Sequence, residues 1–420
     1  MTACNLADGA CDERTDSTLL RVTRILFLVA LVAGFAQFGA VASLNDVAKH
    51  FGHHSAGRSL QSQVGLSGSV LGLALAILRL SSLGALPLSS LADQWGRTRV
   101  LRRTLLVGLL ATAAAALSPA YWFFVLCFAF ARPLLSAAST LVQVVTVELS
   151  STERRIHQLA VMAAGAGIGA GLSAVLHGVI RGPDSFRWLF ALTLLPVVIV
   201  APLSRRIPEP VHTTAASPLA HLGRVPLEVR GRLAIVAVIV FSVGMITGPA
   251  NGFAFVYGEG ILKLSPHYVA TIVALSAITG LMGLLLSRHL SHAIGRRWTV
   301  AIGVVSTGVT ATYAYSGGRL NFTLGYMIGV GAAGLLAPAV SAMSTEIFSH
   351  SIRATTAGWI VVAGVLGATV GLFLFGWVGD AVRATSATSF RVPALATFLP
   401  LLPTLLLLIR LPESSLMELS

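Results

Sequence analysis

The sequence predicts an all-α integral membrane protein that crosses a bilayer twelve times and consists of two pseudo-symmetric six-helix bundles. Only 11% of its 420 residues are charged and 55% are hydrophobic, whereas a soluble domain carries about a quarter charged residues. Apolar runs of about 20 residues, the length that spans a bilayer as a helix, recur along the whole chain. Short landmark sequences in the first half return in the second half.

The amino-terminal half, residues 22–204, contains six candidate spans. They are residues 22–44, 65–90, 103–119, 121–145, 157–180 and 187–204. A polar arm, residues 1–21, precedes them. Because no small-residue cleavage site follows a short apolar core, we interpret the first run as a retained span rather than a signal peptide.

The carboxyl-terminal half, residues 232–411, contains six more. They are residues 232–257, 267–287, 299–316, 320–343, 354–379 and 393–411. A polar linker at 205–231 joins the halves, and a tail at 412–420 ends the chain. The apolar runs do not alternate with a period of two residues, so we expect helices and not the strands of a barrel.

The placement of lysine and arginine predicts the orientation. With a cytoplasmic amino terminus, nineteen of these residues fall in cytoplasmic segments and eight in outer segments, and positive residues accumulate on the cytoplasmic side. We therefore expect a multi-pass protein of the plasma membrane with both termini cytoplasmic. The net charge of +13 is scattered over short gaps rather than gathered on one surface, which argues against nucleic-acid binding.

Several patterns that could indicate enzyme chemistry have simpler explanations. The three cysteines form neither a disulfide framework nor a metal-ligand spacing. GAGIGA (165–170) fits a dinucleotide fingerprint, but it lies inside an apolar span with no preceding strand, so helix packing explains it better. HFGHH (50–54) has only Asp46 nearby to complete a set of metal ligands. We predict no cofactor, no metal and no enzyme activity.

Three landmarks occur once in each half at offsets of 199, 198 and 205 positions. They are Gly96-Arg97 and Gly295-Arg296, Glu148 with Arg155 and Glu346 with Arg353, and the segments RRIPEP (205–210) and RLPESS (410–415). Such agreement indicates an internal repeat of six helices.

The first landmark resembles the hallmark motif of the major facilitator superfamily of secondary transporters, G-x-L-a-D-r-x-G-r-k-x-x-l between helices 2 and 3. The matching residues are Leu91, Ala92, Asp93, Gly96, Arg97, Arg99 and Leu101. Ser89 replaces the first glycine and Gln94 the arginine, while His292 replaces the aspartate of the second copy. The resemblance covers nearly the whole chain and implies alternating access between two six-helix halves, and we expect a functional monomer.

The landmark residues are the candidate gating residues. They are Asp93, Gly96, Arg97, Arg99, Glu148, Arg155, Gly295, Arg296, Glu346 and Arg353. Asp93 lies at the carboxyl end of its span, where the helix dipole disfavours a carboxylate, so we expect a partner near 353–356 or in Arg155. That contact would join the halves when the inner side is closed and favour the outward-open state. Alternatively, the arginines only set the topology and Gly96 turns the chain.

Four polar residues lie on one face of the apolar span at 121–145. They are Arg132, Ser136, Ser139 and Gln143. Their spacing of four, three and four positions places them on one side of a helix, and such a stripe faces water or protein rather than lipid. The resemblance implies that helices 1, 4, 7 and 10 line a central cavity, which adds Gln37 and Asn251. The segment GPANG (248–252) is expected to weaken the helix around Asn251 and free backbone groups for a ligand.

Arg79 is a second arginine inside a span. It precedes Asp93 by fourteen residues, or about 21 Å along a helix, and so lies near mid-membrane. We predict a substrate cavity lined by Arg79, Arg132, Ser136, Gln143, Gln37 and Asn251. Hydrogen bonds between packed helices are the alternative role for any single Ser, Gln or Asn.

These observations predict a secondary transporter that exports a small organic molecule by alternating access. The alternative is import, exchange or uniport of an organic anion, favoured by two arginines without a mid-span carboxylate. A remote alternative is a non-transporting membrane sensor or a membrane enzyme on the same scaffold. Proton coupling stays open, with Asp46, Glu259 and His177 as the candidate carriers.

Overall fold

The structure is a computed structural model in which every regular element of the described residues is a helix. It describes residues 7–53, 60–150, 154–180, 182, 184–209, 226–348, 352–384 and 386–409. The predicted linker and carboxyl-terminal tail therefore lie largely outside the described residues.

The first group of helices covers the amino-terminal half. It comprises α1 (Ala7–Ala42), α2 (Leu44–Phe51), α3 (Leu60–Val64), α4 (Gly68–Ser81), α5 (Ala85–Trp95), α6 (Arg97–Ala114), α7 (Tyr121–Leu149), α8 (Arg155–Val179), α9 (Ser185–Ala191) and α10 (Leu194–Leu203). A short 3₁₀ turn, Ser82–Gly84, links α4 to α5 within one predicted span.

The second group covers the carboxyl-terminal half. It comprises α11 (Leu227–Gly252), the π-helical turn η5 (Val256–Ile261), α12 (Pro266–Ile294), α13 (Arg296–Ala314), α14 (Arg319–Ile347), α15 (Arg353–Ala381), α16 (Arg391–Phe398) and α17 (Leu401–Leu408).

Ten helical stretches among the described residues are long and apolar enough to cross a membrane. They confirm an all-helical membrane fold and correspond to ten of the twelve expected spans. The other two, 299–316 and 393–411, coincide with α13 and with the pair α16 and α17. Two arginines, one serine and four threonines make α13 less apolar, and the last segment is divided between Phe398 and Leu401. A count of twelve spans remains a prediction.

Two hydrophobic cores each belong to a single half. One gathers residues such as Val29, Leu105 and Leu141 from α1, α6 and α7. The other gathers residues of α11, α13 and α14. Each group of helices therefore has its own buried centre.

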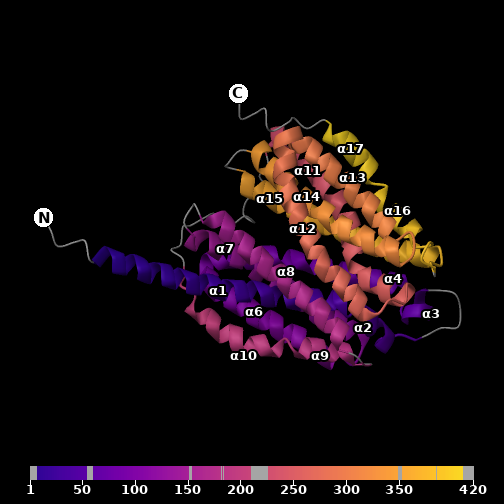
Figure 1. The fold of residues 1–420 in the computed structure, drawn as a ribbon, viewed down its shortest axis with the longest axis horizontal. Coiled ribbons are helices and arrows are strands. Elements are labelled where there is room, and N and C mark those ends of the chain that lie inside the picture. Colours follow the sequence, from indigo (N-terminus) through magenta and orange to yellow (C-terminus); the bar gives the residue numbers. More distant parts are fainter. Residues whose placement is uncertain are drawn as a thin grey trace.

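A third core joins the halves at one end of the molecule, where Leu71, Phe255 and Phe375 belong to the same buried cluster. There α4 contacts α15 and α8 contacts α12. Figure 1 shows the two groups meeting beside α2, α3 and α4. We call this end, defined by α2, α3 and η5, the closed end.

Small residues allow the α4–α15 crossing to be tight. A Cβ on Gly68 would lie 2.6 Å from the backbone oxygen of Gly376, and one on Gly72 would lie 2.6 Å from that of Leu372. Helices in a membrane approach closely where glycine leaves the backbone bare. The crossing therefore brings the two halves into direct backbone contact.

Candidate functional site

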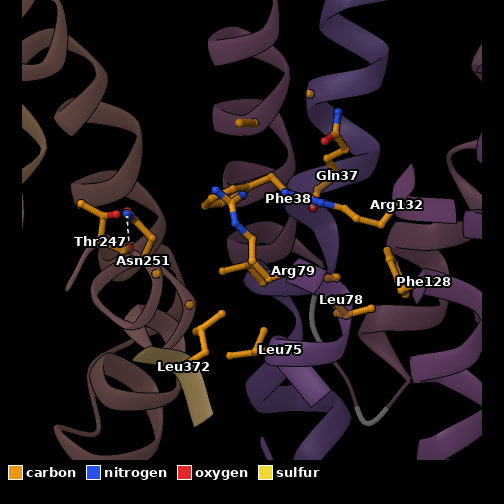
Figure 2. Close-up of a pocket in the computed structure, with 16 residues that line it drawn as sticks. Gln37, Phe38, Leu75, Leu78, Arg79, Phe128, Arg132, Thr247, Asn251 and Leu372 are labelled. Atoms are coloured by element: carbon orange, nitrogen blue, oxygen red, sulfur yellow. Dashed lines mark hydrogen bonds between the residues drawn. The ribbon is translucent and has the colours of Figure 1, made fainter. Parts of the chain in front are cut away.

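A cavity of about 370 Å³ lies between the two halves. Its walls come from α1, α4, α7 and α8 on one side and from α11 and α15 on the other, so both halves contribute (Figure 2). The polar lining residues are Gln37, Arg79, Arg132, Thr247 and Asn251. None of the described residues that line the cavity is a carboxylate. The volume lies in the range of small-molecule sites, about 300–1,000 Å³.

Arg132 is held against α1 by the backbone of Gln37. Its Nη1 donates to the Gln37 carbonyl oxygen over 3.0 Å. The Gln37 side chain is tied to α7 in return, because its Nε2 donates to Ser139 Oγ over 3.0 Å and its Oε1 accepts a weaker contact from Ser136 Oγ at 3.4 Å. These contacts fix the guanidinium group beside α1, while Arg132 still lines the cavity.

Arg79 enters the same cavity from the last turn of α4. The helix ends two residues after it, at Ser81, and Ser82 Oγ donates to the Arg79 carbonyl oxygen over 2.6 Å. Its Nε is buried without a hydrogen-bond partner among the described residues. Figure 2 shows the Arg79 side chain in the space between Gln37 and Asn251, while the Arg132 side chain reaches the backbone of Gln37 from the other side of α1. The two positive charges repel each other, and the cavity offers no described carboxylate to offset them.

Asn251 lies on the opposite wall in the last turn of α11. Its Oδ1 accepts a hydrogen bond from Tyr326 Oη over 3.1 Å, and its Nδ2 donates to the Thr247 carbonyl oxygen over 2.8 Å. The helix continues through Pro249 and ends at Gly252, so the expected weak point lies at the end of the GPANG segment. The Pro249 and Ala250 carbonyl oxygens accept from Tyr315 Oη, over 3.3 and 2.9 Å. Tyr315 therefore satisfies the backbone groups that were expected to be free for a ligand.

The landmark motif forms a charged cluster within the amino-terminal half. Arg97 Nη2 contacts Asp93 Oδ1 at 3.2 Å, and Arg97 also pairs with Glu148. Among the described side chains the contact of Asp93 is with Arg97 rather than Arg155, and the side chain of Arg353, at the start of the other expected region, lies outside the described part. The reason is local, since Arg97 follows Asp93 by four residues and, as the first residue of α6, reaches back across Gly96.

Gly96 and Gly295 occupy equivalent places between two helices of their halves. Their φ angles are +94° and +87°, in the left-handed region that glycine adopts without strain. Beyond Gly96, the side chain of Glu209 accepts a hydrogen bond from the Thr98 amide over 3.2 Å and pairs with the Thr98 hydroxyl. A carboxylate at the start of α6 interacts favourably with the helix dipole. The RRIPEP landmark thus acts as a helix cap.

A buried polar cluster connects the halves at the closed end. His177 at the end of α8 contacts Glu259 of η5 through Nε2 at 2.9 Å and Asp46 of α2 through Nδ1 at 3.5 Å. Asn45 Nδ2 donates to the other Glu259 oxygen over 2.9 Å. Asp46 also accepts a hydrogen bond from Ser185 Oγ over 2.7 Å. Only Glu259 of this cluster comes from the carboxyl-terminal half.

A family model described as Major Facilitator Superfamily matches residues 26–261, more than half of the chain. The chain belongs to the major facilitator superfamily. It is a transporter scaffold rather than an enzyme, as the sequence predicted. No curated protein matches this superfamily member at a significant level.

Solved structures of transporters share the fold of this superfamily member. A mutant of the nucleoside transporter NupG has a TM-score of 0.76 and 13% identity over 93% of this chain and 99% of that chain. An inward-facing bacterial homologue of the human lysosomal transporter Spinster has a TM-score of 0.71 and 15% identity over 94% and 96%. The human organic anion transporter MFSD10 has a TM-score of 0.61 and 17% identity over 91% and 99%.

The superfamily fold brings together some of the expected site residues and separates others. Gln37, Arg79, Arg132 and Asn251 line one cavity. Ser136 contacts Gln37 beside it, whereas Gln143 is exposed and does not line it.

Two further groups of expected residues can be placed. The three candidate proton carriers meet in the cluster of the closed end. The side chains of Glu346 and Arg353 lie outside the described part of the chain.

The sequence analysis missed two residues that contribute to the polar clusters. Asn45, next to Asp46 in the sequence, binds Glu259, and Glu209 was noticed only as part of a repeat. An isolated Asn-Asp pair at the end of an apolar span was the available signal for Asn45. The role of Glu209 depends on the return of the chain to Gly96 after more than a hundred residues, which no local pattern reveals.

Proposed function

We propose that this superfamily member transports a small organic anion with an apolar body by alternating access. The observation that carries the proposal is the pair Arg79 and Arg132 in one cavity without a carboxylate among its described lining residues. Ionisable residues at this depth are costly, about 2.5 kcal/mol or more each on insertion scales. A bound carboxylate, phosphate or sulfonate would offset that cost.

The rest of the cavity supports an apolar body for the cargo. Phe38, Leu75, Leu78, Phe128 and Leu372 are large apolar residues among those that line it. A polyhydroxylated cargo needs many hydrogen-bond partners, because each unpaired polar group costs about 1–3 kcal/mol. Two of the polar lining residues, Gln37 and Asn251, already use their amides within the protein. An amphipathic anion therefore suits this cavity better than a sugar.

The predicted topology assigns the closed end to the outer face, so we interpret this structure as an inward-open state. A cargo that enters from the cytoplasm fits export, the direction expected from the sequence. Vesicles of both orientations, loaded and assayed for counterflow, test the direction. The exposed residue Arg206 tests the orientation, since a cysteine there should react only with cytoplasmic reagents. Labelling from outside intact cells would contradict it.

Binding of a matched pair of ligands tests the cargo. In nanodiscs, we expect the aromatic carboxylate salicylate to bind at least tenfold more tightly than its neutral amide, salicylamide. Arg79→Gln and Arg132→Gln should each weaken salicylate binding by about 1.5–3 kcal/mol, the worth of a hydrogen bond to a charged group. Binding of the amide should change little. Arg206→Gln, a charge change outside the cavity, is the control.

Two outcomes would contradict the proposal. Equal losses for the acid and the amide would show that the arginines only maintain structure. Preferential binding of a cationic analogue would exclude an anionic cargo altogether.

A further inference from the structure

The contacts of His177 disfavour a neutral imidazole ring. Nε2 lies 2.9 Å from Glu259 and Nδ1 lies 3.5 Å from Asp46, and the His177 side chain is 1% exposed. A neutral ring donates from one nitrogen only, so its other lone pair would face a carboxylate oxygen. A doubly protonated ring donates to Glu259 and places its positive charge beside Asp46 as well. The geometry of the closed end therefore favours a bound proton.

Glu259 links this proton to the contact between the halves, because it bonds to residues of the other half. It is the one member of the cluster from the carboxyl-terminal half, it is 5% exposed, and both its oxygens are bound by amino-terminal residues, His177 and Asn45. The glycine that follows it allows the approach, because a Cβ on Gly260 would lie 2.8 Å from Val64. A π-helical turn, which is frequent at functional sites, presents the carboxylate.

The side-chain amide of Asn45 is a second feature that suits a proton-binding cluster. Its Nδ2 binds the Glu259 carboxylate, while its Oδ1 is buried without a partner among the described residues. An amide that is turned over offers an oxygen instead of an NH₂ group. The same side chain can therefore serve Glu259 as a carboxylate or as a carboxyl group.

We propose that His177, between Asp46 and Glu259, is a proton-binding site that latches the two halves together at the closed end. The inference rests on the proposed alternating-access cycle, with the closed end facing outward. When that end opens, Glu259 leaves with its half while Asp46 and Asn45 stay beside His177. The ring is then exposed to water, where an imidazole has a pKa near 6.5. Above that pH the ring releases its proton. Acid outside the membrane therefore favours closure.

The charged groups that face His177 agree with this direction. They are Glu259, Asp46 and, farther away, Lys49, whose positive charge opposes the proton. The two carboxylates are in contact with the ring and outweigh a lysine at the protein surface, because charge interactions weaken with distance and exposure. His50, which is also in α2, pairs instead with Asp184 at 3.4 Å within the same half. It serves as the matched control.

Distances between spin labels on the two halves test the latch. Leu117, 79% exposed in the amino-terminal half, and Leu320, 65% exposed in the carboxyl-terminal half, are replaced by labelled cysteines after the three native cysteines are replaced by serine. In nanodiscs without substrate, we expect the short distance to dominate at pH 5.5. The ratio of closed to open protein should fall by up to tenfold per pH unit as the pH rises, the limit for one linked proton.

Variants separate the latch from general effects of pH. His177→Gln and Glu259→Gln should reduce the change between pH 5.5 and pH 8 to less than twofold, whereas His50→Gln should keep the wild-type dependence. Distances in the wild type that do not change with pH overturn the proposal, and so does a His177→Gln protein with the wild-type midpoint. If salicylate fails to bind but the pH dependence remains, the cargo proposal is wrong and the latch stands.

Discussion

The carboxylate of Asp380 accepts a hydrogen bond of 2.8 Å from the backbone amide of Gly68. Asp380 is near the end of α15 and Gly68 is the first residue of α4, so the contact joins the two halves at the closed end. The other Asp380 oxygen accepts from the Ser69 amide over 2.7 Å and from its hydroxyl over 2.5 Å. An anion of one half thus caps a helix of the other half, where the helix dipole favours negative charge.

Asp380→Asn should loosen the closed end without unfolding either half. Removing the charge from the start of α4 costs about 1–2 kcal/mol of contact energy, and this shifts the population toward the open state. Val64→Cys reports the change, because Val64 is fully buried against η5 in this structure. Its reaction with an impermeant maleimide should become severalfold faster. An unchanged rate would show that Asp380 does not hold the halves together.

Gly72→Ala should act on the same crossing through volume rather than charge. The added methyl would lie 2.6 Å from the Leu372 carbonyl oxygen, so α4 and α15 must separate. The Val64→Cys reporter should again react faster. Gly171→Ala on α8 is the control, because nothing lies within 4 Å of a Cβ at that position. Similar effects of both substitutions would assign the change to helix propensity instead of the crossing.

Arg79 and Arg132 should differ in what they contribute to stability without substrate. Arg79 has a buried Nε that lacks a partner within the described residues, whereas Arg132 donates to Gln37. We expect the Tm of Arg79→Met to equal or exceed that of the wild type. Arg132→Met should be less stable by about 1–3 kcal/mol, because it loses a charged hydrogen bond. The reverse order in thermal unfolding would contradict the roles assigned to these side chains.

Asp93→Asn should slow transport while leaving the fold intact. Arg97 keeps its contact with Glu148, so the cluster survives in this state, but the expected contact of Asp93 with the other half in the outward-open state is weakened. Thr247→Cys, which lines the cavity, should therefore react faster from the cytoplasmic side. Normal transport together with unchanged labelling would limit Asp93 to capping or topology.

Local patterns in the sequence were sufficient for the fold and for part of the cavity. Long apolar runs form helices in a bilayer, because the backbone amide and carbonyl groups must form their hydrogen bonds within the protein there. The four-three-four spacing placed Arg132, Ser136 and Ser139 on the face of α7 that meets Gln37. Gln143 follows the same spacing but ends on an exposed surface, because periodicity defines a face and not how far a neighbouring helix extends along it.

Contacts between distant segments could not be predicted in this way. Glu259 and Asn45 are separated by 214 positions, and their pairing depends on how the halves dock. Under the proposed alternating-access cycle, the partner of Asp93 depends in addition on the conformational state. A sequence pattern does not indicate which conformational state a given structure represents.

The hydrogen bond from Arg132 to the carbonyl oxygen of Gln37 has a consequence for selectivity. A cargo that replaces the Gln37 carbonyl oxygen as the partner of Arg132 must be a better hydrogen-bond acceptor than a peptide carbonyl. Carboxylates and phosphates meet that threshold, because they accept the hydrogen bond and their negative charge also attracts the guanidinium group. Alcohols and amides gain nothing by the exchange. If the cargo is the proposed anion, a weak acid that takes up a proton would lose this advantage and bind Arg132 more weakly as the neutral acid.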